Sequence, residues 1–70
     1  MRTTDEIDFL KKIGDQIKNK RLELSLTQYD LAYKANIADN LIGQIERAES
    51  VASIITIHRI CKILELEITI

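Results

Sequence analysis

Residues 27–47 read TQYDLAYKANIADNLIGQIER, and this stretch decides the fold. Its apolar spacing predicts two short helices, over about residues 27–35 and 39–47, with only a few residues between them. Asn36 stands where the first of them must end, and asparagine tolerates the left-handed backbone conformation that often ends a helix. The stretch therefore predicts two helices joined by a sharp turn, with the second helix presenting an exposed face.

Two further helices are predicted on either side of that stretch, over about residues 5–23 and 53–64. Thr27 is a suitable N-cap for the second helix, and Asp30 completes an acidic version of the capping box. Ser53 is the predicted N-cap of the fourth helix. Four consecutive helices of this kind predict a small all-α domain.

The predicted domain is single and covers residues 1–70, with residues 1–4 frayed and residues 65–70 forming a tail that is either a short strand or packed on a neighbour. Its core is expected to contain the apolar side chains that recur on one face of each helix. These are Phe9, Leu10, Ile13, Ile17, Leu22, Leu24, Leu31, Ala32, Ala35, Ile37, Leu41, Ile42, Ile45, Ile54, Ile57, Ile60, Cys61 and Leu64.

The composition agrees with a small helical domain. Hydrophobic residues make up 46% of the 70 residues, with no proline and two glycines, which leaves little material for β-turns. Cys61 is the single cysteine, so the chain forms no internal disulfide. The N-terminus shows no signal peptide, and the apolar clusters are too short to span a membrane. These features predict a cytoplasmic protein in a reduced setting.

Two helices joined by such a short turn define a helix-turn-helix. The stretch resembles the helix-turn-helix of the lambdoid phage repressors, the Cro proteins and their small relatives, the XRE family. Its amino-acid sequence is most similar to that of the controller proteins of restriction–modification systems. The resemblance covers about residues 10–66 and implies a lambda-repressor-like fold of four to five helices. The matching positions are Arg21, Leu26, Thr27, Gln28, Leu31, Ala32, Ile37, Ile42, Ile45, Glu46 and Arg47.

The resemblance implies that the helix over 39–47 enters the major groove of double-stranded DNA. Gln28 would touch a phosphate and brace that helix, and Arg21 would pair with Glu46 while lying near the DNA backbone. The residues it places at the DNA are Gln28, Asp39, Asn40, Gly43, Gln44, Arg47 and Arg21. Side-chain chemistry supports these roles independently, because Asn and Gln make bidentate contacts to adenine and a carboxylate accepts from cytosine.

The chain departs from the family pattern at three positions. Ala38 replaces the usual serine or threonine, so Asp39 or Asn40 must serve as the N-cap of the third helix. Asp39 also places a carboxylate where phosphates repel it. Ala48 stands where glycine is common, so the helix before it must end in a right-handed or a slightly strained conformation.

The charges are unevenly distributed. The formal net charge is −1, although nucleic-acid binders usually carry a basic excess. The basic side chains gather on the first helix, within residues 9–21. Lys11, Lys12 and Lys18 in that helix form either a plain solvated face or a phosphate clamp.

Nothing in the sequence indicates an enzyme. His58 is the only histidine and is expected to be exposed, and Cys61 is expected to be a small core residue. No spacing suits a nucleophilic triad, a metal site or a phosphate-binding loop. We therefore expect no cofactor, no metal and no small-molecule ligand.

Several apolar residues near the C-terminus have no obvious internal partner. Ile55, Ile63, Ile68 and Ile70, together with Val51, predict an apolar patch that makes a homodimer. The alternative is that they thicken a small core. The prediction is thus a sequence-specific transcriptional regulator, such as a repressor, that binds an inverted-repeat operator as a homodimer. Two other functions remain open: an antitoxin that holds a toxin on this patch, and a protein-interaction module that has lost DNA binding.

Overall fold

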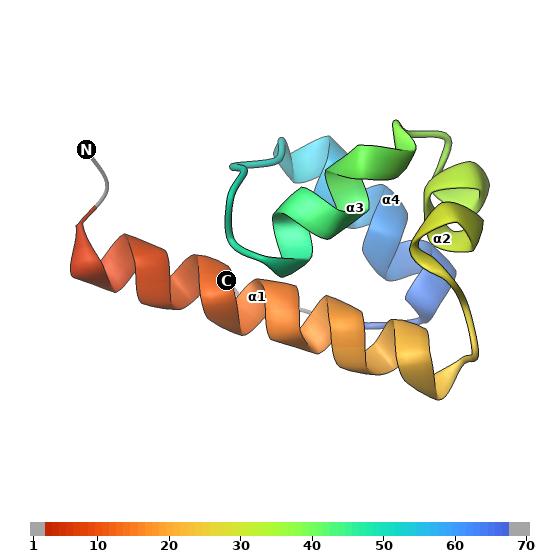
Figure 1. Ribbon diagram of the computed structural model, residues 1–70, viewed down its shortest axis with the longest axis horizontal. Helices are drawn as coiled ribbons and strands as arrows, with labels where there is room; N and C mark the ends of the chain where they lie inside the picture. Colours follow the sequence, from red (N-terminus) through yellow and green to blue (C-terminus); the bar gives the residue numbers. More distant parts are fainter. Residues whose placement is uncertain (1–2, 68–70) are drawn as a thin grey trace.

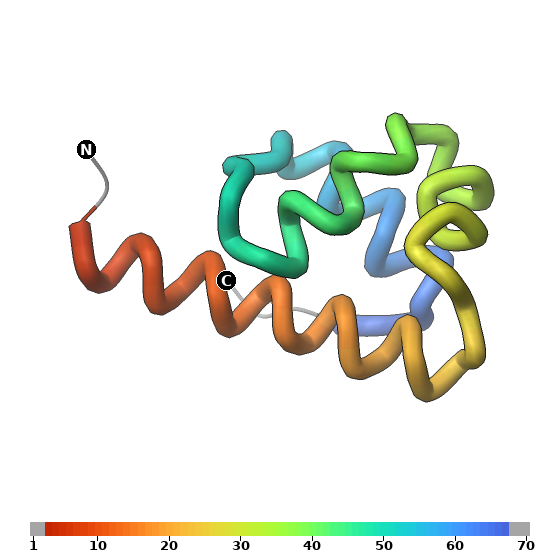
Figure 2. The backbone as a smooth tube through the Cα atoms, in the orientation of Figure 1, coloured from red at the N-terminus to blue at the C-terminus, as the bar shows by residue number. Residues whose placement is uncertain are grey.

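The computed structural model describes residues 3–67, which form four helices and, within that range, no strand. The helices are α1 (Thr4–Glu23), α2 (Gln28–Ala35), α3 (Asp39–Glu46) and α4 (Ile54–Leu64). α1 runs along one side of the molecule, and the other three helices pack together against it (Figure 1). The backbone trace in Figure 2 shows the first turns of α1 extending beyond the other helices. The prediction of an all-α domain is confirmed.

The helix starts follow the predicted caps closely. The Thr27 hydroxyl accepts from the Asp30 N–H at 2.9 Å, and the Asp30 carboxylate accepts from the Thr27 N–H at 3.0 Å. These two bonds lower the pKa of Asp30. The Ser53 hydroxyl accepts from the Thr56 N–H at 3.1 Å. Both predicted caps are therefore confirmed.

Two predictions about helix starts are wrong. Thr3 caps α1 through a capping box with Glu6, so α1 begins at Thr4 rather than at about residue 5. Residues 1–2 lie outside the described part of the chain. Ala38, whose methyl group offers no acceptor, itself holds the N-cap position of α3, so Asp39 does not take over that role.

Each of the four described helices is followed by a non-glycine residue in the left-handed region: Ser25, Asn36, Ala48 and Glu65. Asn36, with φ 58° and ψ 50°, ends α2 as predicted. Ala48, with φ 60°, has the strained alternative of the two expected conformations. A left-handed L-residue without a short polar side chain costs about 1–2 kcal/mol. At these four positions the chain therefore turns without glycine, the residue that adopts the left-handed conformation at the least cost.

The core lies where α4 and the helix-turn-helix meet α1. Its fully buried side chains include Ile17, Leu31, Ile42, Ile60 and Leu64. Burial of such side chains stabilises the fold by roughly 1.5–3 kcal/mol each. The core also contains Ile13, Ala32, Ala35 and Ile45, while Ile37, Leu41, Ile57 and Ile63 pack against it half-buried.

Four residues expected in the core are exposed instead: Phe9, Leu22, Leu24 and Ile54. Ile54 has the largest exposed fraction, 72%, because it lies in the first turn of α4 at the rim of an open groove. Phe9, at 45%, lines the same open groove from α1. Near the end of α1, the buried position is Arg21 rather than the predicted Leu22, which lies on another face of the helix.

Gly14 sets how closely α3 approaches α1. A Cβ atom added at Gly14 would lie 2.6 Å from the carbonyl oxygen of Ile45 and 2.8 Å from that of Glu46. No real Cβ atom tolerates such distances, so the C-terminal end of α3 rests directly on the backbone of α1. This contact holds the exposed face of α3 in a fixed position relative to the rest of the domain.

Candidate nucleic-acid interface

The buried and exposed sides of α3 are sharply divided. Ile42 and Ile45 are buried in the core, and α3 follows α2 after only three residues, 36–38. Asp39 and Asn40 are exposed in its first turn, where the helix dipole is positive. On the same outer side, Gln44 is half-buried and Arg47, just after the helix, is exposed. The outer side therefore carries carboxylate, amide and guanidinium groups over a rigid apolar base.

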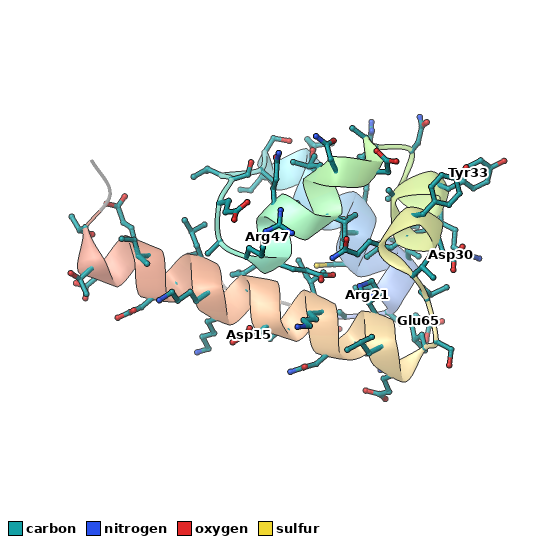
Figure 3. The ribbon with its side chains drawn as sticks, in the orientation of Figure 1. Asp15, Arg21, Asp30, Tyr33, Arg47 and Glu65 are labelled. Atoms are coloured by element: carbon teal, nitrogen blue, oxygen red, sulfur yellow. The ribbon has the colours of Figure 1, made fainter. Side chains whose placement is uncertain are left out.

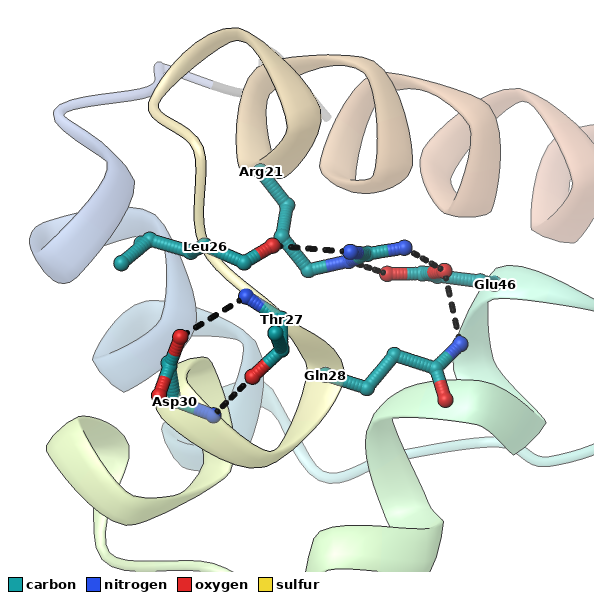
Figure 4. Close-up of polar contacts among 6 residues, drawn as sticks. All are labelled: Arg21, Leu26, Thr27, Gln28, Asp30 and Glu46. Atoms are coloured by element: carbon teal, nitrogen blue, oxygen red, sulfur yellow. Dashed lines mark hydrogen bonds and ion pairs between the residues drawn. The ribbon is translucent and has the colours of Figure 1, made fainter.

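An ion pair beneath this surface ties α1 to α3 (Figure 4). Arg21 donates from Nε to Glu46 Oε2 at 2.7 Å and from Nη2 to Glu46 Oε1 at 3.0 Å. Its Nη1 donates to the Leu26 carbonyl at 2.9 Å. Both charged residues are buried, and the hydrogen bond to Glu46 raises the pKa of Arg21. The predicted pair is present, and it places Arg21 inside the fold rather than on the outer side of α3.

Gln28 joins α2 to the same carboxylate. Its Nε2 donates to Glu46 Oε1 at 3.2 Å, so one glutamate bonds residues from both α1 and α2 (Figure 4). Within residues 3–67, every buried side-chain nitrogen or oxygen has a hydrogen-bond partner. The bracing contact that the family resemblance implied for Gln28 is present. A contact between Gln28 and a phosphate remains a prediction, which its exposed position at the start of α2 supports.

Arg47 lies at the C-terminal end of α3, where Figure 3 labels it. Its Nε donates to Glu49 Oε2 at 3.0 Å, and this bond raises the pKa of Arg47 and lowers that of Glu49. Its guanidinium lies over Gly43: a Cβ there would be 2.9 Å from Arg47 Nη1 and 3.2 Å from Gln28 Oε1. Gly43 is therefore buried by two polar side chains, and the structure brings three predicted DNA-binding residues together.

A groove separates the starts of α2 and α3. It has a volume of about 290 Å³ and is lined by Gln28, Tyr29, Asp39 and Asn40. Tyr29 was not predicted as part of the site. Its ring stacks on that of Tyr33, with centroids 6.3 Å apart. Figure 3 labels Tyr33 on the outer side of α2. The spacing of two tyrosines by four residues was the signal in the sequence for this exposed pair.

An apolar groove lies at the other end of the domain, between the N-terminal half of α1 and the start of α4. It has a volume of about 240 Å³, and its most exposed lining residues are Phe9, Val51 and Ile54. Ile55, from the predicted dimer patch, is also exposed on α4. Ile63, by contrast, packs against the core, so the prediction that it lacks an internal partner is wrong. Ile68 and Ile70 lie outside the described residues.

Residues 3–67 contain no group of His, Cys, Asp and Glu side chains suited to a metal ion. His58 is exposed, as predicted, whereas Cys61 is half-buried rather than a full core residue, and burial raises the pKa of its thiol. No described helix combines the length and apolar character required to cross a bilayer.

The fold and the outer side of α3 define a helix-turn-helix domain. A family model described as helix-turn-helix matches residues 17–70, which is most of the chain, and the protein belongs to this XRE-type family of DNA-binding regulators. No curated protein matches the chain significantly.

Proposed function

We propose that this protein is a cytoplasmic, sequence-specific transcriptional regulator that binds an inverted-repeat operator as a homodimer. One observation carries the proposal. Three helices converge on the buried Glu46 carboxylate, which fixes the outer side of α3 without itself being exposed. Recognition of base edges requires such preorganised side chains, because a misplaced donor or acceptor loses its discrimination.

The outer side of α3 offers suitable chemistry for the major groove. The amides of Asn40 and Gln44 match the donor and acceptor pair of adenine, and the Asp39 carboxylate accepts from cytosine N4. Each good bidentate contact discriminates by about 1–3 kcal/mol. Gln28 lines the groove between α2 and α3, and its amide and the backbone N–H groups at the start of α2 would bind a phosphate there.

Dimerisation would supply the affinity that one short helix lacks. α3 has eight residues, and the net charge of −1 gives little general attraction to DNA. Two copies joined at the apolar groove through Phe9, Val51, Ile54 and Ile55 would bury side chains that are otherwise exposed. Their α3 helices would then enter successive major grooves, roughly 34–36 Å apart. Regulation by the protein's own concentration follows, as in the controller proteins that the sequence resembles.

The test is selection of bound duplexes from a random pool, followed by affinity measurements at increasing salt. We expect a short inverted repeat to be enriched, and the Asn40→Ala and Gln44→Ala variants to lose the preference at one base pair in each half-site. The logarithm of the affinity should fall linearly with that of the salt concentration, by about 0.9 for each phosphate contacted. No enrichment at low salt would overturn the proposal.

The apolar groove also favours a second candidate, in which the partner is a different protein. In an antitoxin this groove would hold a toxin while α3 still binds DNA, and in a pure interaction module DNA binding would be lost. Co-purification of one neighbouring gene product in fixed stoichiometry would support the antitoxin. Binding that does not weaken as salt rises would support the interaction module.

A further inference from the structure

We propose that Glu49 is a positioning residue that orients Arg47 to read one guanine in each half-site. The inference rests on the proposed function, because it concerns the same DNA-facing side of α3. Its basis is a set of three contacts at the end of that helix. Arg47 bonds Glu49, its guanidinium lies over Gly43, and Gln28 flanks the same glycine.

The backbone fixes the position of Glu49. α3 ends in a Schellman motif, in which the Glu49 N–H donates to the Gln44 carbonyl at 2.8 Å and the Ala48 N–H donates to the Ile45 carbonyl at 3.1 Å. Ala48 adopts the left-handed conformation that this motif requires, at φ 60°. The chain thereby folds back so that the carboxylate two residues after Arg47 reaches its guanidinium. The end of the helix thus brings the Glu49 backbone close to Arg47, and both side chains of the pair remain more than half exposed.

The atoms involved indicate a base contact rather than a phosphate contact. Glu49 accepts from Nε, whereas a guanidinium reads O6 and N7 of guanine with two of its N–H donors. The terminal amino groups of Arg47 therefore remain at the outer end of the side chain. A phosphate contact needs mainly positive charge, which an adjacent carboxylate reduces. A carboxylate bonded to Nε therefore favours a base contact, in which the orientation of the guanidinium matters more than its positive charge.

Gly43 provides the space for this arrangement. The guanidinium lies back over the preceding turn of α3, where any side chain at position 43 would meet Arg47 Nη1. Gln28, held by Glu46, flanks the same glycine, because its Oε1 would lie 3.2 Å from a Cβ at position 43. Arg47 is thus held at Nε and lies over Gly43 at Nη1, while its side chain stays 57% exposed.

The experiment measures binding to the selected operator and to operators substituted at every position in turn. The wild type should prefer guanine at one position of each half-site. Glu49→Ala should lower that preference about fivefold or more, which is the lower end of what one bidentate contact discriminates. It should also raise the affinity for unrelated DNA, because a negative charge is removed from the surface.

Glu23→Ala is the matched control. Glu23 also forms an exposed ion pair, with Lys20 at 3.4 Å, so the change of charge is the same but the site is on α1. This variant should leave the guanine preference unchanged. In an Arg47→Lys background, which lacks the planar fork, Glu49→Ala should have no further effect on base preference.

The outcomes separate the two proposals. Failure of the wild type to select any sequence would overturn both. Selection of an operator whose base preferences are the same for the wild type and Glu49→Ala would overturn only the role of Glu49. So would an equal loss of preference in Glu49→Ala and Glu23→Ala, because the effect would then come from net charge alone.

Discussion

The two ends of α1 meet the rest of the domain in opposite ways. At the C-terminal end, Arg21 is buried and bonded to α3 and to the following loop. At the N-terminal end, Phe9 is 45% exposed and lines an open apolar groove. At the C-terminal end, the buried polar groups find their hydrogen-bond partners within the same molecule. At the N-terminal end, apolar side chains remain exposed.

The two ends thus differ in how they interact: a buried ion pair joins the C-terminal end of α1 to α3, and apolar side chains stay exposed at the N-terminal end. A buried ion pair is costly to desolvate and adds little stability over apolar packing, but it demands a defined geometry. That geometry fixes α3, whose outer side is the proposed DNA surface. An open apolar groove adds nothing to the isolated molecule and offers a surface for a second one. Variants at each end therefore test stability and association separately.

Breaking the buried pair should have the largest effect. Glu46→Ala leaves the Arg21 guanidinium buried without its carboxylate, and loss of one partner of such a pair costs about 3–5 kcal/mol. Domains of this size are stabilised by only roughly 5–15 kcal/mol, so much of the total is at risk. Chemical denaturation followed by circular dichroism would measure the loss.

The control for that variant replaces both partners. Arg21→Met with Glu46→Leu removes both buried charges, and we expect it to recover most of the stability, since apolar replacements of buried pairs are often neutral or stabilising. Recovery with weaker DNA binding would show that the pair serves to orient α3. A Glu46→Ala variant as stable as the wild type would contradict the role given to the buried pair at the C-terminal end of α1.

Placing a charge in the apolar groove should have the next largest effect. Ile54→Glu would leave the monomer folded, because Ile54 is 72% exposed. It should prevent dimerisation and weaken operator binding about 100-fold, the lower end of the avidity that a linked second site provides. Sedimentation and DNA titration would measure the two effects. Leu22→Glu, which adds the same charge at a side chain that is 55% exposed outside the groove, should change neither.

Adding a methyl group at the contact between α1 and α3 should be moderately destabilising. Gly14→Ala forces a Cβ against backbone carbonyls, which cannot rotate away, and overpacking of this kind costs about 1–3 kcal/mol. Gly43→Ala is the informative comparison, because its nearest atoms belong to flexible side chains. It should keep the melting temperature near that of the wild type while displacing Arg47. Equal losses of stability in the two variants would contradict this distinction.

The smallest predicted effect is a gain in the stability of the folded domain. Ala48→Gly removes the left-handed strain after α3 and should stabilise the domain by about 1 kcal/mol. Asn36→Gly is the control, because asparagine tolerates the same conformation and should gain less. Thermal unfolding would compare them. No gain at Ala48 would show that the greater entropy of glycine in the unfolded chain offsets the strain.

The sequence predicted the features that depend on a few neighbouring residues. The capping box of Thr27 and Asp30, the cap at Ser53 and the left-handed Asn36 all depend on short-range hydrogen bonds and backbone sterics. The pair between Arg21 and Glu46, 25 positions apart, came only from resemblance to a family.

The sequence failed where the outcome depends on segments far apart along the chain. Periodicity placed Phe9 and Ile54 in the core, yet both are exposed, because they lie at an open groove between α1 and the start of α4. Ile63 was assigned to an exposed patch, and α4 turns it toward the core.

By itself, then, the sequence determined the helices, their caps and the turn between α2 and α3, because local interactions decide these. Only the tertiary structure decided that Phe9 and Ile54 would be exposed, that Ile63 would pack against the core, and that an apolar groove would remain open beside Phe9. These features depend on the distances between elements, and those distances are set by packing of the whole domain, as at the contact of Gly14 with the end of α3.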